Sequence, residues 1–383
     1  NLDYVACWYK KASDLIKDSK TTRCAFVSTN SITQGEEVAT LWKPLFDEGI
    51  RIDFAWKTFK WTSESEHQAA VHCVIVGFSC HTDSILLTQN QDKNHCDNKK
   101  IFNADGTVTA AKNINGYLAD ADNVFLERRQ KPLFNVPEII MGPMSISGNN
   151  LILTEEEREN ILRKEPESEK WIKRFSMGRE FIDGTKRYCL WLKDISPAQL
   201  RNLPMILNRV KACKEWRESQ PKTGDAYKLK DMPHLFRPAA KFDETRPYFA
   251  MPQTSSENRK YIPMAFVEND MIPGQKLYII SDADLYLFGV MTSNVHNAWT
   301  RTVCGRLEMR YSYSIFIVYN NFPWCNPTDS QKAKIEQTAQ AILDARAKYP
   351  DSSLADLYDE TTMPPDLRKA HKENDKAVMA AYG

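Results

Sequence analysis

The order of hydrophobic segments in the first 80 residues limits most strongly what this chain can fold into. Residues 4 to 16 predict a helix, with Tyr4, Val5, Trp8, Ala12 and Leu15 on one face, and the run Cys24–Thr29 predicts a buried strand. A second helix is expected over residues 34–49, followed by strands at residues 50–55 and 70–78. Helix, strand, helix, strand, strand is part of an α/β sheet, and it is too little for a complete domain.

The chain changes character twice after this point. Residues 84–125 are polar and rich in Asn and Asp, and a region of mixed helices and strands follows, so we place a boundary near residue 118. In this α+β region Thr154 and Glu157 form a capping box for a charged helix over residues 154–173. Residues 181–192 predict a hairpin with an Asp-Gly turn, and residues 197–217 predict an amphipathic helix. Strands are expected at residues 248–251, 261–266, 277–280 and 285–291.

The C-terminal part of the chain predicts helices only. Thr328 and Gln331 cap one helix, which Pro350 ends, and a last helix starts near Pro365. The sequence therefore predicts three parts: an α/β part at residues 1–118, an α+β part at residues 119–327 and a helical subdomain at residues 328–383.

Composition excludes several classes of protein. The 51 Lys and Arg residues nearly balance the 50 Asp and Glu residues, which excludes a histone-like polycation. No uninterrupted apolar run is long enough for a membrane span, so no membrane partner is expected. The nine cysteines are scattered and include no C-x-x-C pair, which predicts a reduced, cytoplasmic setting.

Common catalytic and metal-binding signatures are missing from the sequence. It holds no G-x-S-x-G, no H-E-x-x-H, no phosphate-binding loop and no G-x-G-x-x-G. We therefore expect no nucleotide-like cofactor on this chain alone. The doublets His72-Cys73, Cys80-His81 and His95-Cys96 raise the question of zinc. Because no chelating spacing connects them and a thiol in an apolar strand is ordinary core, we assign no metal.

Two segments suggest contact with a polyanion. Residues 201–260 hold thirteen Lys and Arg against seven acidic residues, a local net charge of +6. An exposed, solvated face explains this bias as well as nucleic-acid binding does. In Gly305–Ser314, an extended backbone would project Glu308, Arg310 and Ser312 from one face and pack the intervening residues on the other. Such a row can read base edges, or Glu308 and Arg310 can simply pair with each other.

Several long strings resemble the MmeI-like DNA adenine methyltransferases, which belong to bifunctional type II restriction-modification enzymes. The strings are Leu2–Tyr9, Ala25–Glu36, Arg306–Ser314, Val318–Trp324, Ala341–Leu357 and Thr362–Gly383. The resemblance implies the C-terminal half of an S-adenosylmethionine-dependent methyltransferase domain, then a target recognition domain, then a helical C-terminus. The family's cofactor and catalytic motifs lie upstream of Leu2 and are absent here, so no catalytic residue is expected in this chain. Asn321-Phe322-Pro323-Trp324 is superficially similar to the catalytic motif but matches the end of the recognition domain.

The resemblance also implies roles for individual residues. Base-reading positions align with Gln253, Gln275, Lys276, Glu308, Arg310 and Ser312. Glu308 and Arg310 suit the two halves of one C·G pair, which by the resemblance lies beside the methylated adenine. Phe59 and Trp61 are candidates for stacking on a flipped adenine, with ordinary aromatic packing as the alternative.

Four further expectations complete the functional hypothesis. Arg259 and Lys260 are expected to contact phosphates. The partners are double-stranded DNA and the missing N-terminal half of the methyltransferase, on the same or a separate polypeptide. S-adenosylmethionine serves the full enzyme and is not expected on this chain alone. The alternative is a stand-alone sequence-specific DNA-binding module without catalytic activity.

Overall fold

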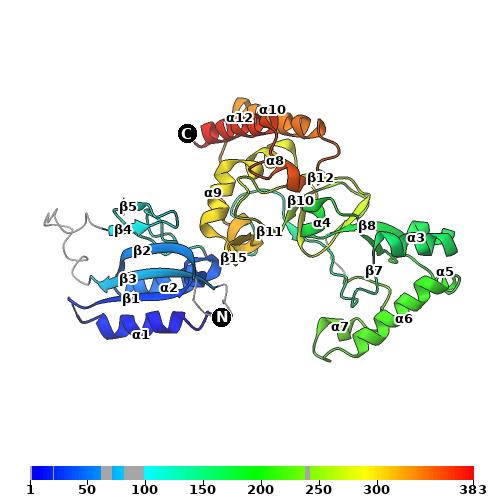
Figure 1. The fold of residues 1–383 in the computed structure, drawn as a ribbon, viewed down its shortest axis with the longest axis horizontal. Helices are drawn as coiled ribbons and strands as arrows, with labels where there is room; N and C mark the ends of the chain where they lie inside the picture. The colour runs from blue at the N-terminus through cyan, green and yellow to red at the C-terminus, as the bar shows by residue number, and fades with distance from the viewer. Residues whose placement is uncertain (1, 20, 62–70, 82–98, 238–241) are drawn as a thin grey trace. The chain divides into compact units, whose positions relative to one another are not determined.

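The chain forms two compact units, each assembled from segments that are distant in sequence (Figure 1). The structure is a computed structural model that describes all residues except 1, 20, 62–70, 82–98 and 238–241. Unit 1 comprises Asn1–Phe134 with Ala298–Pro323, and unit 2 comprises Asn135–Asn297 with Trp324–Gly383. The domain boundaries near residues 118 and 327 stay predictions. Within the described ranges, no helix has the length and apolar character needed to cross a membrane.

Unit 1 is built on a five-stranded sheet with the order β1-β3-β2-β4-β5. Its strands are β1 (Arg23–Thr29), β2 (Ile50–Trp61), β3 (Val71–Cys80), β4 (Lys99–Phe102) and β5 (Val108–Ala111). Strand β3 runs antiparallel to both β1 and β2, whereas β2 and β4 are parallel. The apolar run expected over residues 70–78 is thus an inner strand of the sheet. This arrangement confirms the α/β prediction for the N-terminal part.

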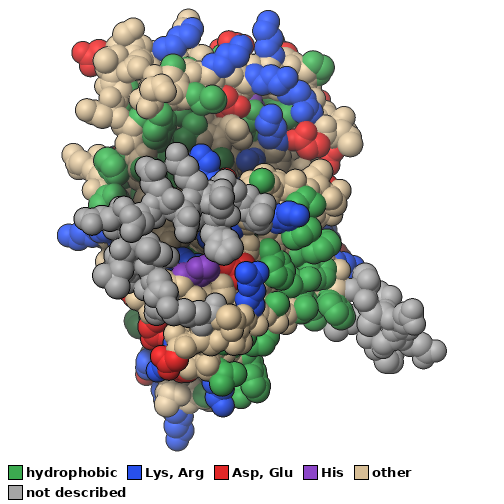
Figure 2. Space-filling view, turned by 90° about the vertical axis from the view of Figure 1, so that its left-hand side faces the viewer, with side chains coloured by type: hydrophobic (Ala, Val, Ile, Leu, Met, Phe, Trp, Pro, Cys, Tyr) green, Lys and Arg blue, Asp and Glu red, His purple; other side chains and the backbone are tan. Residues whose placement is uncertain are grey.

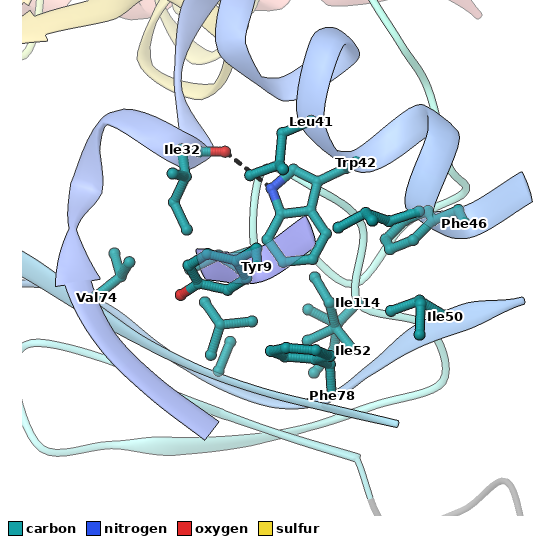
Figure 3. Packing of buried hydrophobic residues seen from close by; sticks show 14 of the residues in the cluster. Tyr9, Ile32, Leu41, Trp42, Phe46, Ile50, Ile52, Val74, Phe78 and Ile114 are labelled. Carbon is teal, nitrogen blue, oxygen red and sulfur yellow. Dashed lines mark hydrogen bonds between the residues drawn. The ribbon is translucent and has the colours of Figure 1, made fainter. Parts of the chain in front are cut away.

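Aromatic side chains from three elements fill the core of unit 1. Tyr9 of helix α1 (Ala6–Ile16) lies between Trp42 of helix α2 (Gly35–Asp47) and Phe78 of β3, with ring centroids 5.5 Å from each (Figure 3). The Trp42 indole donates to the Ile32 carbonyl at 2.8 Å, and the Tyr9 and Ser28 hydroxyls lie 2.9 Å apart. The polar ends of these buried rings are therefore satisfied.

Unit 1 exposes apolar residues that the sequence predicts to be buried, some on the outer side of α1 and one on the edge strand β1. Tyr4, Trp8 and Leu15 are 75%, 54% and 80% exposed, and α1 turns Ala6, Tyr9, Ala12, Ser13 and Ile16 to the core instead. Strand β1 is an edge strand with Val27 53% exposed, so the prediction of a buried strand was wrong in its burial. The physical reason is that nothing in the described part of unit 1 covers these side chains. Figure 2 shows a continuous patch of hydrophobic side chains on the face that it draws.

Unit 2 contains two four-stranded sheets, ordered β12-β10-β14-β6 and β13-β8-β9-β7. The first sheet is formed by β6 (Ile140–Met141), β10 (Tyr248–Pro252), β12 (Ala265–Val267) and β14 (Leu277–Ile280). The second is formed by β7 (Ile152–Leu153), β8 (Ile172–Ser176), β9 (Tyr188–Leu190) and β13 (Met271–Pro273). Parallel pairing of β13 with β8 joins residues almost 100 positions apart, which no local pattern signals.

Helices make up the rest of unit 2, and their bounds correct several predictions. They are α3 (Glu155–Lys164), α4 (Gly178–Asp183), α5 (Pro197–Arg201), α6 (Pro204–Glu218), α7 (Asp225–Lys228), α8 (Leu285–Thr292), α10 (Asp329–Ala347), α11 (Leu354–Leu357) and α12 (Pro365–Tyr382). Helix α9 (Asn294–Val303) contains the boundary between the units.

At three places these helices replace structures that the sequence predicts differently. The expected strand over residues 285–291 is α8, because the Asp284 side chain caps a helix by accepting from the Leu287 amide. The expected Asp-Gly hairpin turn ends α4 instead, with Gly184 in the left-handed region at φ 71°. The single helix expected over residues 197–217 is broken into α5 and α6 before Pro204.

A buried guanidinium ties together the segments around α6. Arg217 is fully buried, and it donates to the carbonyls of Ser145, Ile146, Leu229, Met232 and Leu235 at 2.8–3.2 Å. Five carbonyls from two loops thus accept hydrogen bonds from one side chain, and those of Leu229 and Met232 also accept from the backbone amides of Met232 and Leu235.

The first prediction concerns stability in acid. Burial lowers the pKa of His296 to about 4 from an ordinary value of 6.5. Below pH 6.5 the unfolded chain binds a proton that the folded chain does not, so stability falls as the pH drops. We expect a loss of about 2 kcal/mol between pH 6.5 and pH 4.5 from this residue. Urea unfolding across this range measures it.

The matched control for this experiment is His81→Gln. The His81 side chain is 46% exposed, so the control should keep the full pH dependence, whereas His296→Gln should weaken it. Equal slopes for the wild type and His296→Gln would contradict the prediction.

Candidate nucleic-acid interface

The segment expected to be extended around Glu308 is a tight hairpin in unit 1. Strands β15 (Gly305–Leu307) and β16 (Arg310–Ser312) pair antiparallel, with Leu307 opposite Arg310, so Glu308 and Met309 form a two-residue turn. The extended backbone considered for this segment is therefore interrupted by a turn, although Tyr311 and Tyr313 are buried as an extended β16 requires. Arg310 and Ser312 share one face of β16, and Glu308 stands at the tip of the turn.

Glu308 adopts a backbone conformation that disfavours its residue type. Its φ is +60°, in the left-handed region, at the first turn position of a two-residue hairpin. Glycine is the usual residue where such a turn needs a positive φ, because it has no Cβ to clash. A charged residue held there costs roughly 1–2 kcal/mol, and strain of this kind is concentrated at functional sites.

Arg306 holds the turn in place from inside the hairpin. Its guanidinium donates to the Met309 carbonyl at 2.9 Å and to the Arg301 carbonyl at 3.0 Å, and it lies 4.6 Å from the Tyr311 ring centroid. These contacts make Arg306 a structural residue of the hairpin. No sequence pattern distinguishes it from Arg310, so the sequence analysis did not identify this role.

The structure brings Glu308 and Arg310 into a direct ion pair. Arg310 Nη2 lies 2.9 Å from Glu308 Oε2. The Glu308 side chain is 60% exposed and the Arg310 side chain is 45% exposed. An exposed pair of this kind contributes at most about 1 kcal/mol to stability. Opening the pair to make other hydrogen bonds therefore costs little, so both side chains can turn to a ligand.

Three other predicted base readers lie together in unit 2. Strand β10 pairs with β14 so that Pro252 faces Leu277, and the backbone amide of Gln253 donates to the Lys276 carbonyl at 3.0 Å. Gln253 and Gln275 are half-buried, and Lys276 is exposed. The Gln275 Oε1 atom is buried and has no hydrogen-bond partner among the described residues. The pairing of β10 with β14 thus brings together the segments of Gln253 and Gln275, which are 22 positions apart. The side-chain oxygen of Gln275 is left to accept a hydrogen bond.

The predicted phosphate contacts follow in a loop of the same unit. Arg259 is half-buried, and its Nε has no hydrogen-bond partner in the part of the chain that the structure describes. Lys260 is exposed, with its ammonium 5.5 Å from the Tyr261 ring centroid. A buried guanidinium nitrogen without an acceptor carries a desolvation cost that a bound phosphate would relieve.

Much of the charge counted over residues 201–260 is already neutralised. Arg237 pairs with Asp225, and Arg246 pairs with Asp282, at 3.0 and 2.7 Å. Arg209 contacts Glu157 at 3.0 Å, Arg217 is buried, and Lys241 lies outside the described residues. The local net charge of the sequence therefore overstates the basic surface, and we place more weight on Arg259 and Lys260.

Phe59 and Trp61 belong to a row of aromatic side chains on β2 and the neighbouring strand β4. The ring centroids of Phe59 and Trp61 lie 6.4 Å apart, and those of Trp56 and Phe59 lie 6.3 Å apart. The Trp56 ring stacks on the Phe102 ring with centroids 5.0 Å apart. Trp61 is 44% exposed at the end of β2. Aromatic packing explains the position of Phe59, whereas Trp61 at the end of the row is only partly covered by the described residues.

Two positions are similar to parts of a cofactor or catalytic motif, Gly35 and Asn321. Gly35 follows β1, has φ +52° and opens α2, as a cofactor-binding glycine would. A Cβ placed on it would lie 3.6 Å from the Gly305 backbone, an ordinary van der Waals distance. The Asn321 amide donates to the carbonyls of Glu127, Phe316 and Ile317, which makes it a structural residue.

The doublets considered for zinc make other contacts. The Cys80 thiol donates to the Lys17 carbonyl at 3.2 Å, and His81 lies 3.0 Å from the Ser79 hydroxyl, while His95 and Cys96 fall outside the described residues. Among the described residues, no three His, Cys, Asp or Glu side chains form a metal-binding group.

Family models match the MmeI DNA-methyltransferase domain at residues 1–89, the MmeI target recognition domain at residues 120–326 and the MmeI C-terminal domain at residues 327–383. The chain therefore belongs to the MmeI family, as the sequence resemblance indicates.

Two relatives match along the whole chain. DNA methyltransferase A of Bacillus subtilis (strain 168) is 38% identical over 384 residues, which cover 100% of this chain and 41% of the relative. The solved structure of the type IIL restriction-modification enzyme MmeI in complex with DNA matches with a TM-score of 0.89 at 42% identity, covering 100% of this chain and 50% of that one. This chain thus spans half or less of the length of either relative.

The second prediction follows from the strained turn. Glu308→Gly should keep or raise the melting temperature, because relief of the positive φ outweighs the added flexibility of the unfolded chain, with a gain of up to about 1 kcal/mol. Leu307→Gly is the matched control, since Leu307 is 54% exposed and lies in a strand where glycine is unfavourable. Thermal unfolding of both variants checks this. A clear loss of stability in Glu308→Gly would show that the turn is not strained.

Proposed function

We propose that this chain recognises a specific sequence in duplex DNA as part of a site-specific DNA adenine methyltransferase of a restriction-modification system. The hairpin carries the proposal, because its strained tip presents Glu308 beside Arg310, an acceptor next to a donor, to solvent. The match of the whole chain to an enzyme solved with DNA supports it.

The chemistry of the pair suits one C·G base pair. An ionised glutamate only accepts hydrogen bonds, which fits the cytosine amino group, while the arginine fork fits the two major-groove acceptors of guanine. Ser312, on the same face of β16 as Arg310, adds a hydroxyl that can donate or accept.

The second reading position consists of Gln253, Gln275 and Lys276. A glutamine amide matches the paired donor and acceptor of adenine, and a lysine ammonium suits guanine acceptors or a phosphate. The buried Gln275 oxygen without a described partner supports this role, because a base amino group would satisfy it.

We also propose that Trp61, with Phe59 behind it, stacks on the flipped adenine. Extruded bases are held between aromatic side chains in enzymes that modify them. The exposed face of Trp61 supports this, and the packed row that contains Phe59 favours a supporting role for that ring.

The partner of unit 1 in this proposal is the remaining half of the methyltransferase domain, on the same or another polypeptide. The open edge of β1 and the exposed apolar side chains Tyr4, Trp8, Leu15 and Val27 support an interface there. That half would supply the S-adenosylmethionine site and the catalytic residues. This chain alone is then not expected to bind the cofactor measurably.

The alternative function is a stand-alone sequence-specific DNA-binding module. It shares the base-reading residues and differs in having no catalytic half to join. The coding DNA upstream separates the two, since an in-frame cofactor motif and Asn-Pro-Pro-Phe would establish the enzyme.

The third prediction concerns affinity. Replacing Arg259 and Lys260 together by Ala should weaken binding to all sequences alike and reduce the salt slope by roughly 2, because two phosphate contacts are lost. Lys211→Ala with Lys214→Ala is the matched control, being two exposed lysines of the same basic stretch on α6. Titration of labelled duplexes at several salt concentrations measures both. A loss confined to one sequence would make Arg259 or Lys260 a base reader instead.

The fourth prediction concerns specificity and tests the proposed function. Glu308→Lys combined with Arg310→Asp exchanges donor and acceptor, and should turn a preferred C·G into G·C at one position and leave the others unchanged. A good base contact discriminates by about 1–3 kcal/mol, roughly tenfold to a hundredfold. Selection of bound duplexes from a randomised pool compares the two proteins.

The matched control is Arg174→Asp combined with Asp270→Lys, another exposed pair with a 3.2 Å contact but outside the proposed interface. It should leave the selected sequence unchanged. An unchanged preference in the Glu308 and Arg310 double variant, or a change elsewhere in the site, would reduce these two residues to a surface ion pair.

A further inference from the structure

The helical C-terminus contributes a buried polar cluster that surrounds the segment directly after Arg259 and Lys260. We call it the C-terminal clamp, and its side chains are Tyr261, Arg346, Tyr358, His371 and Asp375. Tyr261, Tyr358 and His371 are at most 2% exposed. His371 and Asp375 lie four residues apart on α12 and therefore share one face of that helix.

Contacts of α12 hold both the ring and the hydroxyl of Tyr261. The His371 ring stacks on the Tyr261 ring with centroids 4.2 Å apart and planes inclined by 23°. The Tyr261 hydroxyl donates to Asp375 Oδ2 at 2.7 Å, and the other oxygen of Asp375 accepts from the Asn294 amide at 2.7 Å. One carboxylate thus joins Tyr261 to the start of α9.

The protonation state of His371 follows from its neighbours. Tyr358 accepts from two nitrogens of Arg346, so its hydroxyl proton points to His371 Nε2, 2.8 Å away, which must be unprotonated. Arg346 also donates to the Met264 carbonyl at 2.6 Å. The clamp therefore fixes the chain at Tyr261 and again at Met264.

We propose that the C-terminal clamp positions the loop with Arg259 and Lys260 for contact with the DNA backbone, with His371 and Asp375 as positioning residues. This inference rests on the phosphate role proposed above for the loop. Tyr261 follows Lys260 directly in the chain. Because both the ring and the hydroxyl of Tyr261 are held by α12, the backbone positions from which the Arg259 and Lys260 side chains extend are fixed. The helical C-terminus then acts on DNA binding without touching DNA.

Asp375→Asn tests the proposal with the smallest change in shape. An amide has one oxygen for two donors, so its nitrogen must face either the Tyr261 hydroxyl or the Asn294 amide. Asn374→Asp is the matched control, since Asn374 is the neighbouring residue of α12 and fully buried. Its amide binds the Gly289 carbonyl at 2.8 Å and the Thr338 hydroxyl at 3.1 Å, outside the clamp.

Titration of the full chain with duplex DNA at several salt concentrations gives the readout. Both variants should lower the melting temperature, but only Asp375→Asn should flatten the salt slope, by roughly 1–2, and weaken binding about tenfold for all sequences. Added to the Arg259 and Lys260 double variant, Asp375→Asn should produce no further change in slope.

The outcomes separate this inference from the proposed function. An unchanged slope in folded Asp375→Asn, while the Arg259 and Lys260 variant loses slope, would overturn the positioning role alone. An unchanged slope in the Arg259 and Lys260 variant would overturn the phosphate contact and this inference with it. If Asp375→Asn does not fold, Tyr261→Phe, which removes one hydroxyl, decides by the same measurement.

Discussion

The guanidinium of Arg217 holds five backbone carbonyls of unit 2 that have no place in a helix or strand ladder. Buried carbonyls need donors, and a loop without regular structure must find them in side chains. Because one residue supplies all five, the loops around residues 145 and 229–235 are fixed to α6 and to each other. The basic stretch of residues 201–260 therefore includes one cation, Arg217, whose charge stabilises the fold and does not add to the basic surface.

The sequence predicted the elements whose signals are local. The capping boxes at Thr154 and Thr328 and the start of α12 near Pro365 are found where they were expected, since each needs only residues three or four apart. An apolar run such as residues 285–291 is ambiguous between strand and helix, and the Asp284 cap decided it. The buried face of α1 could not be predicted, because the apolar residues of this helix do not indicate which other element packs against them.

The roles of the candidate site residues stay predictions, and their geometry could not be predicted from the sequence. The family resemblance identified Glu308, Arg310 and the two glutamines, but the pairing of β10 with β14 that joins Gln253 to Lys276 depends on contacts far apart in the chain. The turn at Glu308 was missed because a glutamate is a poor predictor of positive φ. The clamp around Tyr261 has no sequence signature, since its members come from four separate segments.

The contact between Glu308 and Arg310 has a consequence for how a chain of this kind can evolve. Reversing the charge of either residue alone places two like charges about 3 Å apart at an exposed tip, which is unfavourable before any DNA is bound. The two positions are therefore epistatic: the benefit of one substitution depends on the other being present. Under the proposed function, new specificities at the base pair that these residues read should arise by paired changes, so natural relatives should carry matched combinations and few of the intermediates between them.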